Sequence, residues 1–428
     1  MKKTSELKTI AVDLLKPAEY NPRKQLKPGD KEYEKIKNSI TEFGFADPLV
    51  VNSDMTIIGG HQRLSVAKDL GYTEVPCAVV ELDKTREKAL NIALNKITGE
   101  WDDSLLADLL VDLQNENFNT DFTGFEAPEI DMLFSKVHDK NVKEDDFDVE
   151  EELKKPCFSK TGDIWHLGKH TVICGDSTSP DTFKNLLAGT KVNLVCIDPP
   201  YLIALESTSG KITNDDLDDE KGYEFILSAL MRVSENMADD ASIYMFYADS
   251  KTQIFANAFD KAGFHRSATV IWKKDRLVLT RTDFKYIHEP ITYGWLKSGT
   301  HKWYGDQKQT TVVEFPRINN SKTEGFGHPS SKPVSLIAYL IKQSTMTNGI
   351  VLDSFLGSAS TLIACEQLDR VCFGAELEPK FVDVAVKRYL KYFEDSGEPP
   401  KEIYVMRNGQ KLTLDEALQE MKESDYNG

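Results

Sequence analysis

Three short apolar runs, each followed by an acidic residue, constrain the fold of this chain more than any other feature. The runs span residues 192–197, 350–352 and 371–375, and the acids that follow them are Asp198, Asp353 and Glu376. Nearly continuous apolar runs are typical of parallel strands that are buried on both faces. Apolar residues at helical spacing over 360–368 and after Val382 indicate helices between and behind these strands. The pattern predicts βαβ units, and so an α/β domain whose parallel sheet is covered on both faces.

The first acid begins the tetrapeptide Asp198-Pro199-Pro200-Tyr201. It lies at the carboxyl end of a strand, where open α/β sheets bind their ligands. The prolines end the strand and fix the backbone, so that a carboxylate, a rigid carbonyl and an aromatic face converge. This set suits a planar ring that carries an amino group, because Asp198 and the Pro199 carbonyl accept its N–H hydrogens while Tyr201 stacks on it. A strand-ending turn with a solvated acid is the alternative.

The second acid begins a run of small residues, 353–361, between a strand and a helix. Such a turn exposes backbone N–H groups and hydroxyls near the crevice of the sheet. Because the run lacks the G-x-G-x-x-G pattern, the expected ligand is a nucleoside-like cofactor other than a dinucleotide. Glu376 lies about twenty residues further along, in the position of a ribose-binding acid. A βαβ unit without a ligand is the alternative.

Charge is unevenly distributed along the chain. The net charge of −17 would repel nucleic acid if it were evenly spread. Residues 266–332, however, contain twelve Lys and Arg against six acidic residues, a net charge of +6. This basic region is a candidate surface for a polyanion, and a solvated face of mixed charge is the alternative. Aromatic residues among the cations either stack on bases or pack in the core: Trp272, Trp295, Trp303 and Tyr304.

An acidic stretch over residues 139–158 predicts an interdomain linker. Ahead of it, residues 48–51 and 75–80 predict strands on either side of a helix over 62–70. Residues 86–113 predict appended helices. We therefore expect the following parts: a small α/β domain over 1–95, appended helices over 96–138, the linker, a large domain over 159–395, and a hairpin with a helix over 396–428.

The composition excludes several classes of protein. No apolar stretch approaches the ~20 residues that a membrane span needs, and the basic start leads into no apolar segment. We therefore expect a cytoplasmic protein without a membrane partner. The six cysteines lack C-x-x-C spacing, so neither a disulfide framework nor a metal site is expected.

With these motifs in this order, residues 159–395 resemble the amino-group (N6-adenine or N4-cytosine) DNA methyltransferases in their permuted β-type arrangement. The target-amine motif comes first, then the basic region, then the sequence HPSSKP at 328–333, and then the Asp353 turn. The resemblance implies a Rossmann-like mixed sheet with helices on both faces, S-adenosylmethionine as cofactor and double-stranded DNA as partner. It assigns two sets of residues: catalysis to Asp198, Pro199, Pro200 and Tyr201, and cofactor binding to Asp176, Lys332, Asp353, Phe355, Gly357, Ser358 and Glu376.

In that family an aspartate at the first motif position is associated chiefly with adenine, and a serine with cytosine. Asp198 therefore favours N6-adenine methylation by base flipping and direct transfer, with N4-cytosine as the alternative. Ser354, Ala359 and Ser360 stand where the family usually has Pro, Gly and Thr. They are also small, so we expect cofactor binding to survive. The expected DNA contacts are basic: Lys273, Lys274, Arg276, Arg281 and Lys285.

Residues 9 to about 82 resemble the ParB/sulfiredoxin-like nucleotide-binding fold. The matching pieces are Asn21-Pro22-Arg23, residues 44–51 and Gly59-Gly60-His61-Gln62-Arg63-Leu64. A glycine turn that leads into a helix with an arginine in its first turn is an anion site. We therefore expect Arg23, Gly60, His61 and Arg63 to bind nucleotide phosphate or the DNA backbone. A histidine replaces the sulfiredoxin cysteine, which excludes that chemistry.

The combined resemblance is typical of restriction-modification or phage modification enzymes. Only residues 291–327 remain for reading a DNA target, so we expect a short target, or help from elsewhere in the chain or from a second subunit in a homodimer. The alternative function is regulatory instead of enzymatic: a ParB-like factor that binds CTP or DNA and whose methyltransferase half is not catalytic.

Overall fold

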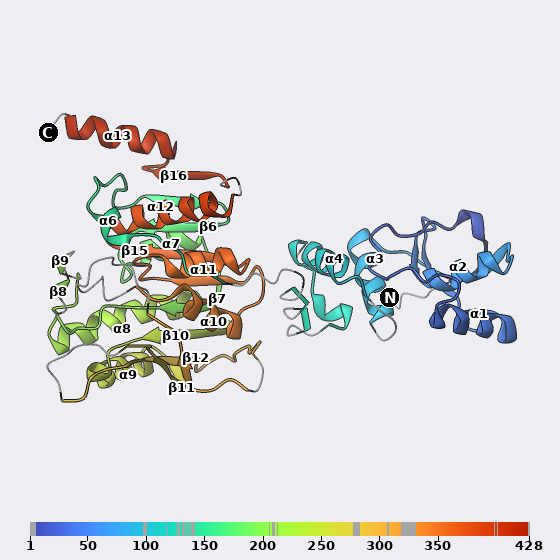
Figure 1. The fold of residues 1–428 in the computed structure, drawn as a ribbon, viewed down its shortest axis with the longest axis horizontal. Helices are drawn as coiled ribbons and strands as arrows, with labels where there is room; N and C mark the ends of the chain where they lie inside the picture. The colour runs from blue at the N-terminus through green and yellow to red at the C-terminus, as the bar shows by residue number, and fades with distance from the viewer. Residues whose placement is uncertain are drawn as a thin grey trace. The chain divides into compact units, whose positions relative to one another are not determined.

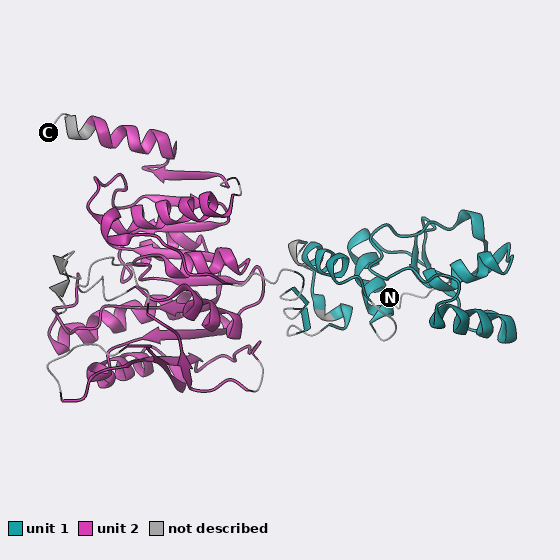
Figure 2. Cartoon of the chain, in the orientation of Figure 1, with its two compact units in different colours: residues 1–139 teal, residues 140–428 magenta. Residues whose placement is uncertain are grey.

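The computed structural model of the chain describes residues 6–96, 101–116, 118–125, 129–130, 133–134, 137, 142–204, 206–207, 210–211, 213–276, 283–305, 308–317, 331–397, 399 and 401–426. The chain divides into two compact units, Met1–Asp139 and Lys140–Gly428 (Figure 2). No helix within the described residues is both long and apolar enough to cross a membrane.

Unit 1 contains a four-stranded sheet in the order β1-β4-β2-β3. Its strands are β1 (Glu6–Ala11), β2 (Leu49–Asn52), β3 (Ile57–Gly59) and β4 (Glu74–Val80), and its main helices are α1 (Lys31–Phe43), α2 (His61–Asp69), α3 (Lys84–Asn95) and α4 (Asp103–Asn115). The predicted strands and helix before residue 95 thus lie within two residues of β2, α2 and β4. Gly60 enters α2 with φ 95°, and a side chain there would collide with Leu49.

Unit 2 is built on one mixed sheet, whose order over the described residues is β13-β11-β12-β10-β7-β14-β15-β6-β5-β16-β17 (Figure 1). The strands are β5 (Ile164–Leu167), β6 (His170–Cys174), β7 (Val192–Ile197), β10 (Met237–Phe246), β11 (Phe264–Lys273), β12 (His288–Leu296), β13 (Val312–Glu314), β14 (Ile350–Asp353), β15 (Val371–Glu376), β16 (Ile403–Arg407) and β17 (Gln410–Thr413). A separate pair, β8 (Glu206–Ser207) and β9 (Gly210–Lys211), lies outside this sheet.

Helices cover both faces of this sheet, and each face has its own apolar core. The helices α7 (Pro180–Leu187), α8 (Asp219–Asn236) and α9 (Thr252–Lys261) contribute buried residues to one core. The other core contains buried residues of α10 (Val334–Ser344), α11 (Ser360–Gln367) and α12 (Pro379–Ser396). The expected mixed α/β fold with helices on both faces is therefore confirmed.

The topology places a crevice between β7 and β14. These strands are parallel neighbours. After β7 the chain passes through α8 to β10 on one side, and after β14 it passes through α11 to β15 on the other side. Because α8 and α11 lie on opposite faces, the loops diverge at the carboxyl ends of β7 and β14. Ligands of open α/β sheets bind at such a switch point.

The acidic stretch expected to be a linker is instead packed on unit 2 over residues 142–155, the acidic segment. Phe147 and Val149 are buried against Val384 of α12, and a short helix, α6 (Val149–Leu153), follows. Glu144 accepts the backbone N–H groups at the start of α10. The linker prediction is wrong for these residues because their partners lie about two hundred positions later, beyond any local pattern. Residues 139–141 lie outside the described residues.

The chain ends in a hairpin and a helix, as the sequence of the tail indicates. The strand β16 pairs with β5 and extends the sheet, and β17 pairs with β16. Asn408 and Gly409 join them with φ values of 50° and 79°, as a tight hairpin turn requires. The last helix, α13 (Leu414–Tyr426), follows at once.

We expect Phe147→Ala to destabilise unit 2 by about 2–4 kcal/mol, because it removes a buried ring from the contact between the acidic segment and α12. Urea unfolding of the full chain measures this loss. Asp146→Ala, at an exposed neighbouring position, is the matched control and should change the free energy of unfolding by less than about 0.5 kcal/mol. Equal stability of the two variants would contradict the docking of the acidic segment.

Candidate active site

A cavity of about 390 Å³ lies at the switch point, within the range of small-molecule sites. Its walls come from the carboxyl ends of β6, β7, β10, β14 and β15 and the loops after them. Every residue that the sequence assigned to catalysis or to the cofactor lines it: Asp176, Asp198, Pro199, Pro200, Tyr201, Lys332, Asp353, Phe355, Gly357, Ser358 and Glu376. The parallel strands bring these separate motifs to one edge of the sheet.

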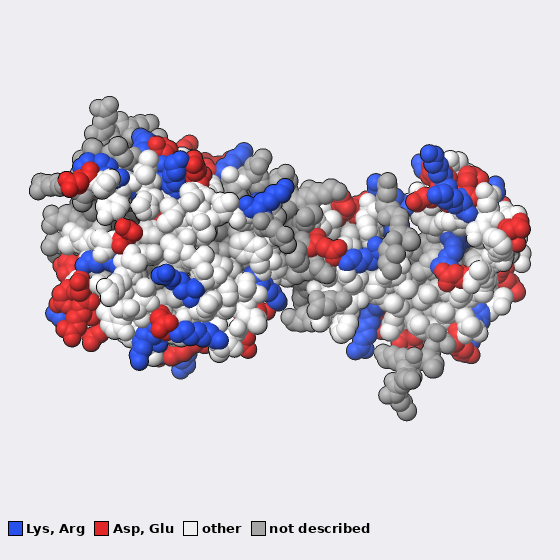
Figure 3. Space-filling view, turned by 90° about the horizontal axis from the view of Figure 1, so that it is seen from below, with Lys and Arg blue, Asp and Glu red and all other residues white. Residues whose placement is uncertain are grey.

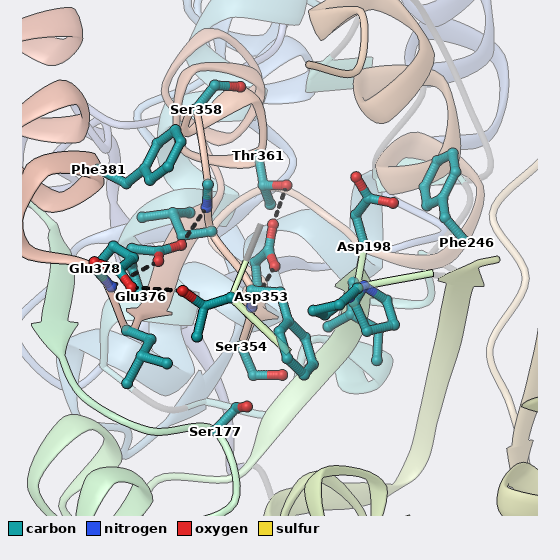
Figure 4. A pocket seen from close by; sticks show the side chains of 18 of the residues that line it. Ser177, Asp198, Phe246, Asp353, Ser354, Ser358, Thr361, Glu376, Glu378 and Phe381 are labelled. Atoms are coloured by element: carbon teal, nitrogen blue, oxygen red, sulfur yellow. Dashed lines mark hydrogen bonds between the residues drawn. The ribbon is translucent and has the colours of Figure 1, made fainter. Parts of the chain in front are cut away.

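Asp353 occupies the middle of the cavity, with Asp198 on one side and Glu376 on the other (Figure 4). Its two carboxylate oxygens accept hydrogen bonds from the Thr361 hydroxyl, at 2.6 Å, and from the Phe355 backbone N–H, at 3.0 Å. Burial raises the pKa of Asp353 to about 7 despite these two donors. Its charge therefore changes near neutral pH.

The turn after Asp353 is held from two directions. Glu376 accepts the Gly357 N–H at 2.8 Å, which ties the turn to the end of β15. Arg388 of α12 donates to the Ser358 carbonyl at 2.6 Å and is itself held by Asp145 of the acidic segment at 2.8 Å. The turn is therefore a rigid cradle whose shape depends on both α12 and the acidic segment.

The small-residue departures in this turn have a structural cost at one position. Ala359 adopts φ 66°, in the left-handed region that glycine enters more readily. It is fully buried at the start of α11 and forms part of the core. The cradle therefore keeps its form with alanine at a modest backbone strain.

Asp198 follows β7 and holds one partner. Its Oδ2 accepts from the Lys332 ammonium at 2.6 Å. Its Oδ1 is buried, and within the described part of the chain it accepts no hydrogen bond. Burial raises the pKa of Asp198, although the Lys332 ammonium opposes the rise. Burial works against the charge of Lys332, but the carboxylates of Asp198 and Glu289 outweigh it and raise the pKa of Lys332.

The sequence places Glu289 only at the end of the catalytic motifs and assigns it no role, whereas the structure shows it half-buried in β12 beside this pair. It accepts the Tyr201 hydroxyl at 2.9 Å and the Lys274 ammonium, and it lies 3.4 Å from the Lys332 ammonium. Burial opposes its charge, but the two lysines lower its pKa to about 2. Its contacts do not follow from the local sequence, because they depend on the place of β12 between β10 and β11 in the sheet.

Further wall residues were also missed. Phe246 at the end of β10 lies beside Asp198, and Phe381 of α12 lies near Glu376 and Glu378 (Figure 4). Ser177, after β6, completes this part of the wall. Aromatic residues are common in strands and helices, so their facing toward a cavity carries no sequence signal.

The residues expected to contact DNA differ in their exposure and in their ion pairs. The prediction that Lys274 contacts DNA is wrong. Lys274 is buried and paired with Glu289, because β11 ends against β12, and its charge therefore does not reach the surface. Lys273 and Arg276 are half-exposed and pair with Glu314 and Asp275. Lys285 is exposed, and Arg281 lies outside the described residues.

Acidic partners take up part of the excess positive charge of the basic region, since Lys297 and Lys302 pair with Asp260 and Asp240. On the face shown in Figure 3, basic and acidic side chains are interspersed. Trp272 packs in the core, where its indole donates to the Phe315 carbonyl. Trp303 is 37% exposed.

The four residues of the expected anion site in unit 1 are engaged in contacts of their own. Arg63 pairs with Asp47. The ring of His61 accepts the Ala18 N–H at 3.3 Å, and burial lowers its pKa to about 4. Arg23 lies over the Trp101 ring at 5.5 Å. Gly60 provides the turn into α2. Anion binding here stays a prediction.

Comparison with known families accounts for most of the chain. Residues 192–387 match the family described as DNA methylase. Residues 104–161 match the ParB-methyltransferase helix-turn-helix (HTH) domain, and residues 1–96 match the ParB N-terminal domain. The ParB N-terminal and DNA methylase matches follow the order that the sequence motifs indicated, whereas the helix-turn-helix match covers residues that the motifs described only as appended helices and a linker.

Individual relatives cover mainly unit 2. The chain is 29% identical over 190 residues to a putative methylase, YubD, of Escherichia coli (strain K12), a match that covers 44% of this chain and 78% of the relative. It is 23% identical over 234 residues to type II methyltransferase M2.MboI of Moraxella bovis, with 48% and 84% covered. The crystal structure of the M1.HpyAVI-SAM complex matches with a TM-score of 0.38 at 18% identity, over 51% of this chain and 97% of that one.

The raised pKa of Asp353 makes a prediction about stability. The usual aspartate pKa is 3.8 and the folded value is about 7, so between these values the folded state binds the extra proton. Its contribution to the free energy of unfolding therefore falls as pH rises, by up to about 1.4 kcal/mol per pH unit. Asp353→Asn, which resembles the protonated form, should gain stability relative to the wild type from pH 5 to pH 7 in urea unfolding. A constant difference between the two proteins would contradict the raised pKa.

Proposed function

The chain carries a DNA methylase domain of the N6/N4 family behind a ParB N-terminal domain, and on this premise we propose that it methylates the N6 amino group of adenine in DNA. S-adenosylmethionine, the methyl donor of this family, supplies an electrophilic methyl group. The cavity residues fit it in chemical type, because acidic groups at Asp353 and Glu376 suit an ammonium and ribose hydroxyls respectively.

The observation that carries the proposal is the unpartnered Oδ1 of Asp198. A buried acceptor without a donor costs free energy, so it is expected to meet a donor when the site works. An exocyclic amine is such a donor. When its nitrogen gains a methyl group it must release a proton, and the raised pKa of Asp198 suits a carboxylate that receives one.

The surroundings of Asp198 suit a flipped base. Pro199 and Pro200 fix the loop, and the rings of Tyr201 and Phe246 line the same cavity. Aromatic faces hold extruded bases by stacking. Adenine is preferred to cytosine in this proposal because an aspartate stands first in the motif, which the family associates chiefly with N6-adenine.

Unit 1 is proposed to supply part of the DNA binding. In unit 2, β12 and β13 take residues 291–296 and 312–314 of the expected recognition stretch, 291–327, into the sheet. A stretch shortened in this way offers few contacts to base edges. The proposed additional contact is the part of unit 1 from residue 104 onward, which belongs to the helix-turn-helix match over 104–161.

The experiment that tests the target is incubation of the full chain with unmethylated DNA and isotopically methyl-labelled S-adenosylmethionine, followed by mass spectrometry of the nucleosides. We expect labelled N6-methyladenine. Labelled N4-methylcytosine would keep the reaction class and overturn the adenine assignment. Absence of label, with the cofactor demonstrably bound, would overturn the proposed activity.

Asp198→Ala should lower the transfer rate by about 1000-fold or more, because it removes the acceptor for the amine proton. The affinity for S-adenosylmethionine should change by less than about threefold, because Asp353 and the turn after it are untouched. Isothermal titration and the labelling assay measure the two quantities. Asp216→Ala, an exposed aspartate in the loop after the motif, is the control. Normal transfer by Asp198→Ala would refute the role of Asp198.

A further inference from the structure

Tyr201 has one hydroxyl proton, and two carboxylates near enough to take it. Burial raises the pKa of Tyr201 well above its usual value, and the neighbouring charges of Asp198 and Glu289 raise it further. In the structure the proton goes to Glu289, at 2.9 Å between the oxygens. The Tyr201 hydroxyl is near enough to Asp198 to interact with that carboxylate too, but the Oδ1 of Asp198 accepts no hydrogen bond from the described residues.

The Lys332 ammonium likewise lies between the carboxylates of Asp198 and Glu289. Its nitrogen is 2.6 Å from Asp198 Oδ2 and 3.4 Å from Glu289 Oε2. The contact fixes one oxygen of Asp198 and leaves the other, Oδ1, as the acceptor for an incoming donor. The ammonium also lies 5.2 Å from the ring centres of Tyr201 and Phe246, which limits its freedom to turn.

We propose that Glu289 is a positioning residue that takes the Tyr201 hydroxyl proton and shares the Lys332 ammonium, and so keeps Asp198 Oδ1 open for the target amine. The inference rests on the proposed function. Glu289 is not part of the cavity wall, and it contacts the wall through Tyr201 and Lys332. Its effect on transfer therefore passes through Tyr201 and Lys332.

The balance of charge explains why a carboxylate is needed at this position. Two lysines, Lys274 and Lys332, and two carboxylates, Asp198 and Glu289, form a buried group in which opposite charges are equal in number. A buried ionic group is tolerated when its charges are paired and hydrogen-bonded. Without Glu289, both lysines would turn toward the remaining carboxylate, Asp198.

The substitution Glu289→Gln should change the hydrogen-bond partner of the Tyr201 hydroxyl. A glutamine has one side-chain oxygen, and Lys274 and Lys332 compete for it. The amide NH₂ then faces the Tyr201 oxygen as a donor, so the Tyr201 proton turns to Asp198 Oδ1. That contact occupies the acceptor that the target amine requires.

The test compares kcat and the cofactor KM of the full chain in the labelling assay. Glu289→Gln should lower kcat by about 100-fold with the KM for S-adenosylmethionine within about threefold of the wild type. Adding Tyr201→Phe, which keeps the ring and removes the competing hydroxyl, should restore kcat at least about fivefold. If Glu289 had only a structural role, removing the Tyr201 hydroxyl as well would not restore kcat.

Two further variants keep the test decisive. Glu289→Asp preserves the charge but withdraws the carboxylate from Tyr201, and should show the same loss and the same restoration by Tyr201→Phe, even if Glu289→Gln fails to fold. Lys274→Gln removes the same ion pair but leaves the Tyr201 hydrogen bond, and its loss of kcat should be several-fold smaller.

The outcomes separate this inference from the proposed function. If the wild type transfers methyl groups and the Glu289 variants keep its kcat, or if Tyr201→Phe multiplies their loss, the role of Glu289 is overturned and the methylase activity stands. If Lys274→Gln loses as much as Glu289→Gln, the ion pair alone accounts for the effect, which also overturns the inference. A wild type without transfer overturns both.

Discussion

The parallel pairing of β7 with β14 is the constraint on which the site depends. The helices that follow these two strands lie on opposite faces of the sheet, so the loops after them diverge and leave a crevice. Three acids from separate motifs, Asp198, Asp353 and Glu376, consequently line one cavity. Asp353 is buried and the other two are half-buried at the ends of their strands, and desolvation raises the pKa of all three carboxyl groups. A single topological feature thus fixes both the place and the electrostatics of the site.

Support for the cavity comes from parts of the chain that carry no motif. The acidic segment contacts two elements beside the cavity: Glu144 caps α10, which begins two residues after Lys332, and Asp145 holds Arg388 of α12 against the turn after Asp353. A carboxylate at a helix N-terminus is favoured by the free N–H groups and the helix dipole. The acidic segment, which belongs to unit 2, therefore stabilises the geometry of the cavity, and this gives its charge pattern a structural purpose.

Most of the described lysines in the basic region form ion pairs with carboxylates, so they contribute less to a positive surface potential than their number suggests. The basic region has a net positive charge in the sequence, yet Lys273, Lys274, Lys297, Lys302 and Lys332 each meet a carboxylate. Exposed pairs of this kind contribute little stability, whereas the largely buried pairs around Glu289 fix the positions of Lys332 and Asp198 in the cavity wall. Counting charge along the chain overestimates the surface that DNA can contact, because pairing partners arrive from other strands.

The sequence by itself determined the strands, the helices between them and the acidic residues that line the cavity at the strand ends, because buried parallel strands have a nearly continuous apolar pattern and ligands of such sheets bind at their carboxyl ends. The strand ending before Asp198, the turn after Asp353 and the hairpin at Asn408 all follow from local patterns. Only the tertiary structure decided the roles of Glu289, Lys274 and the acidic segment. Their partners lie in distant strands and helices, and whether a charged side chain is exposed or buried beside an opposite charge depends on packing that local sequence does not encode.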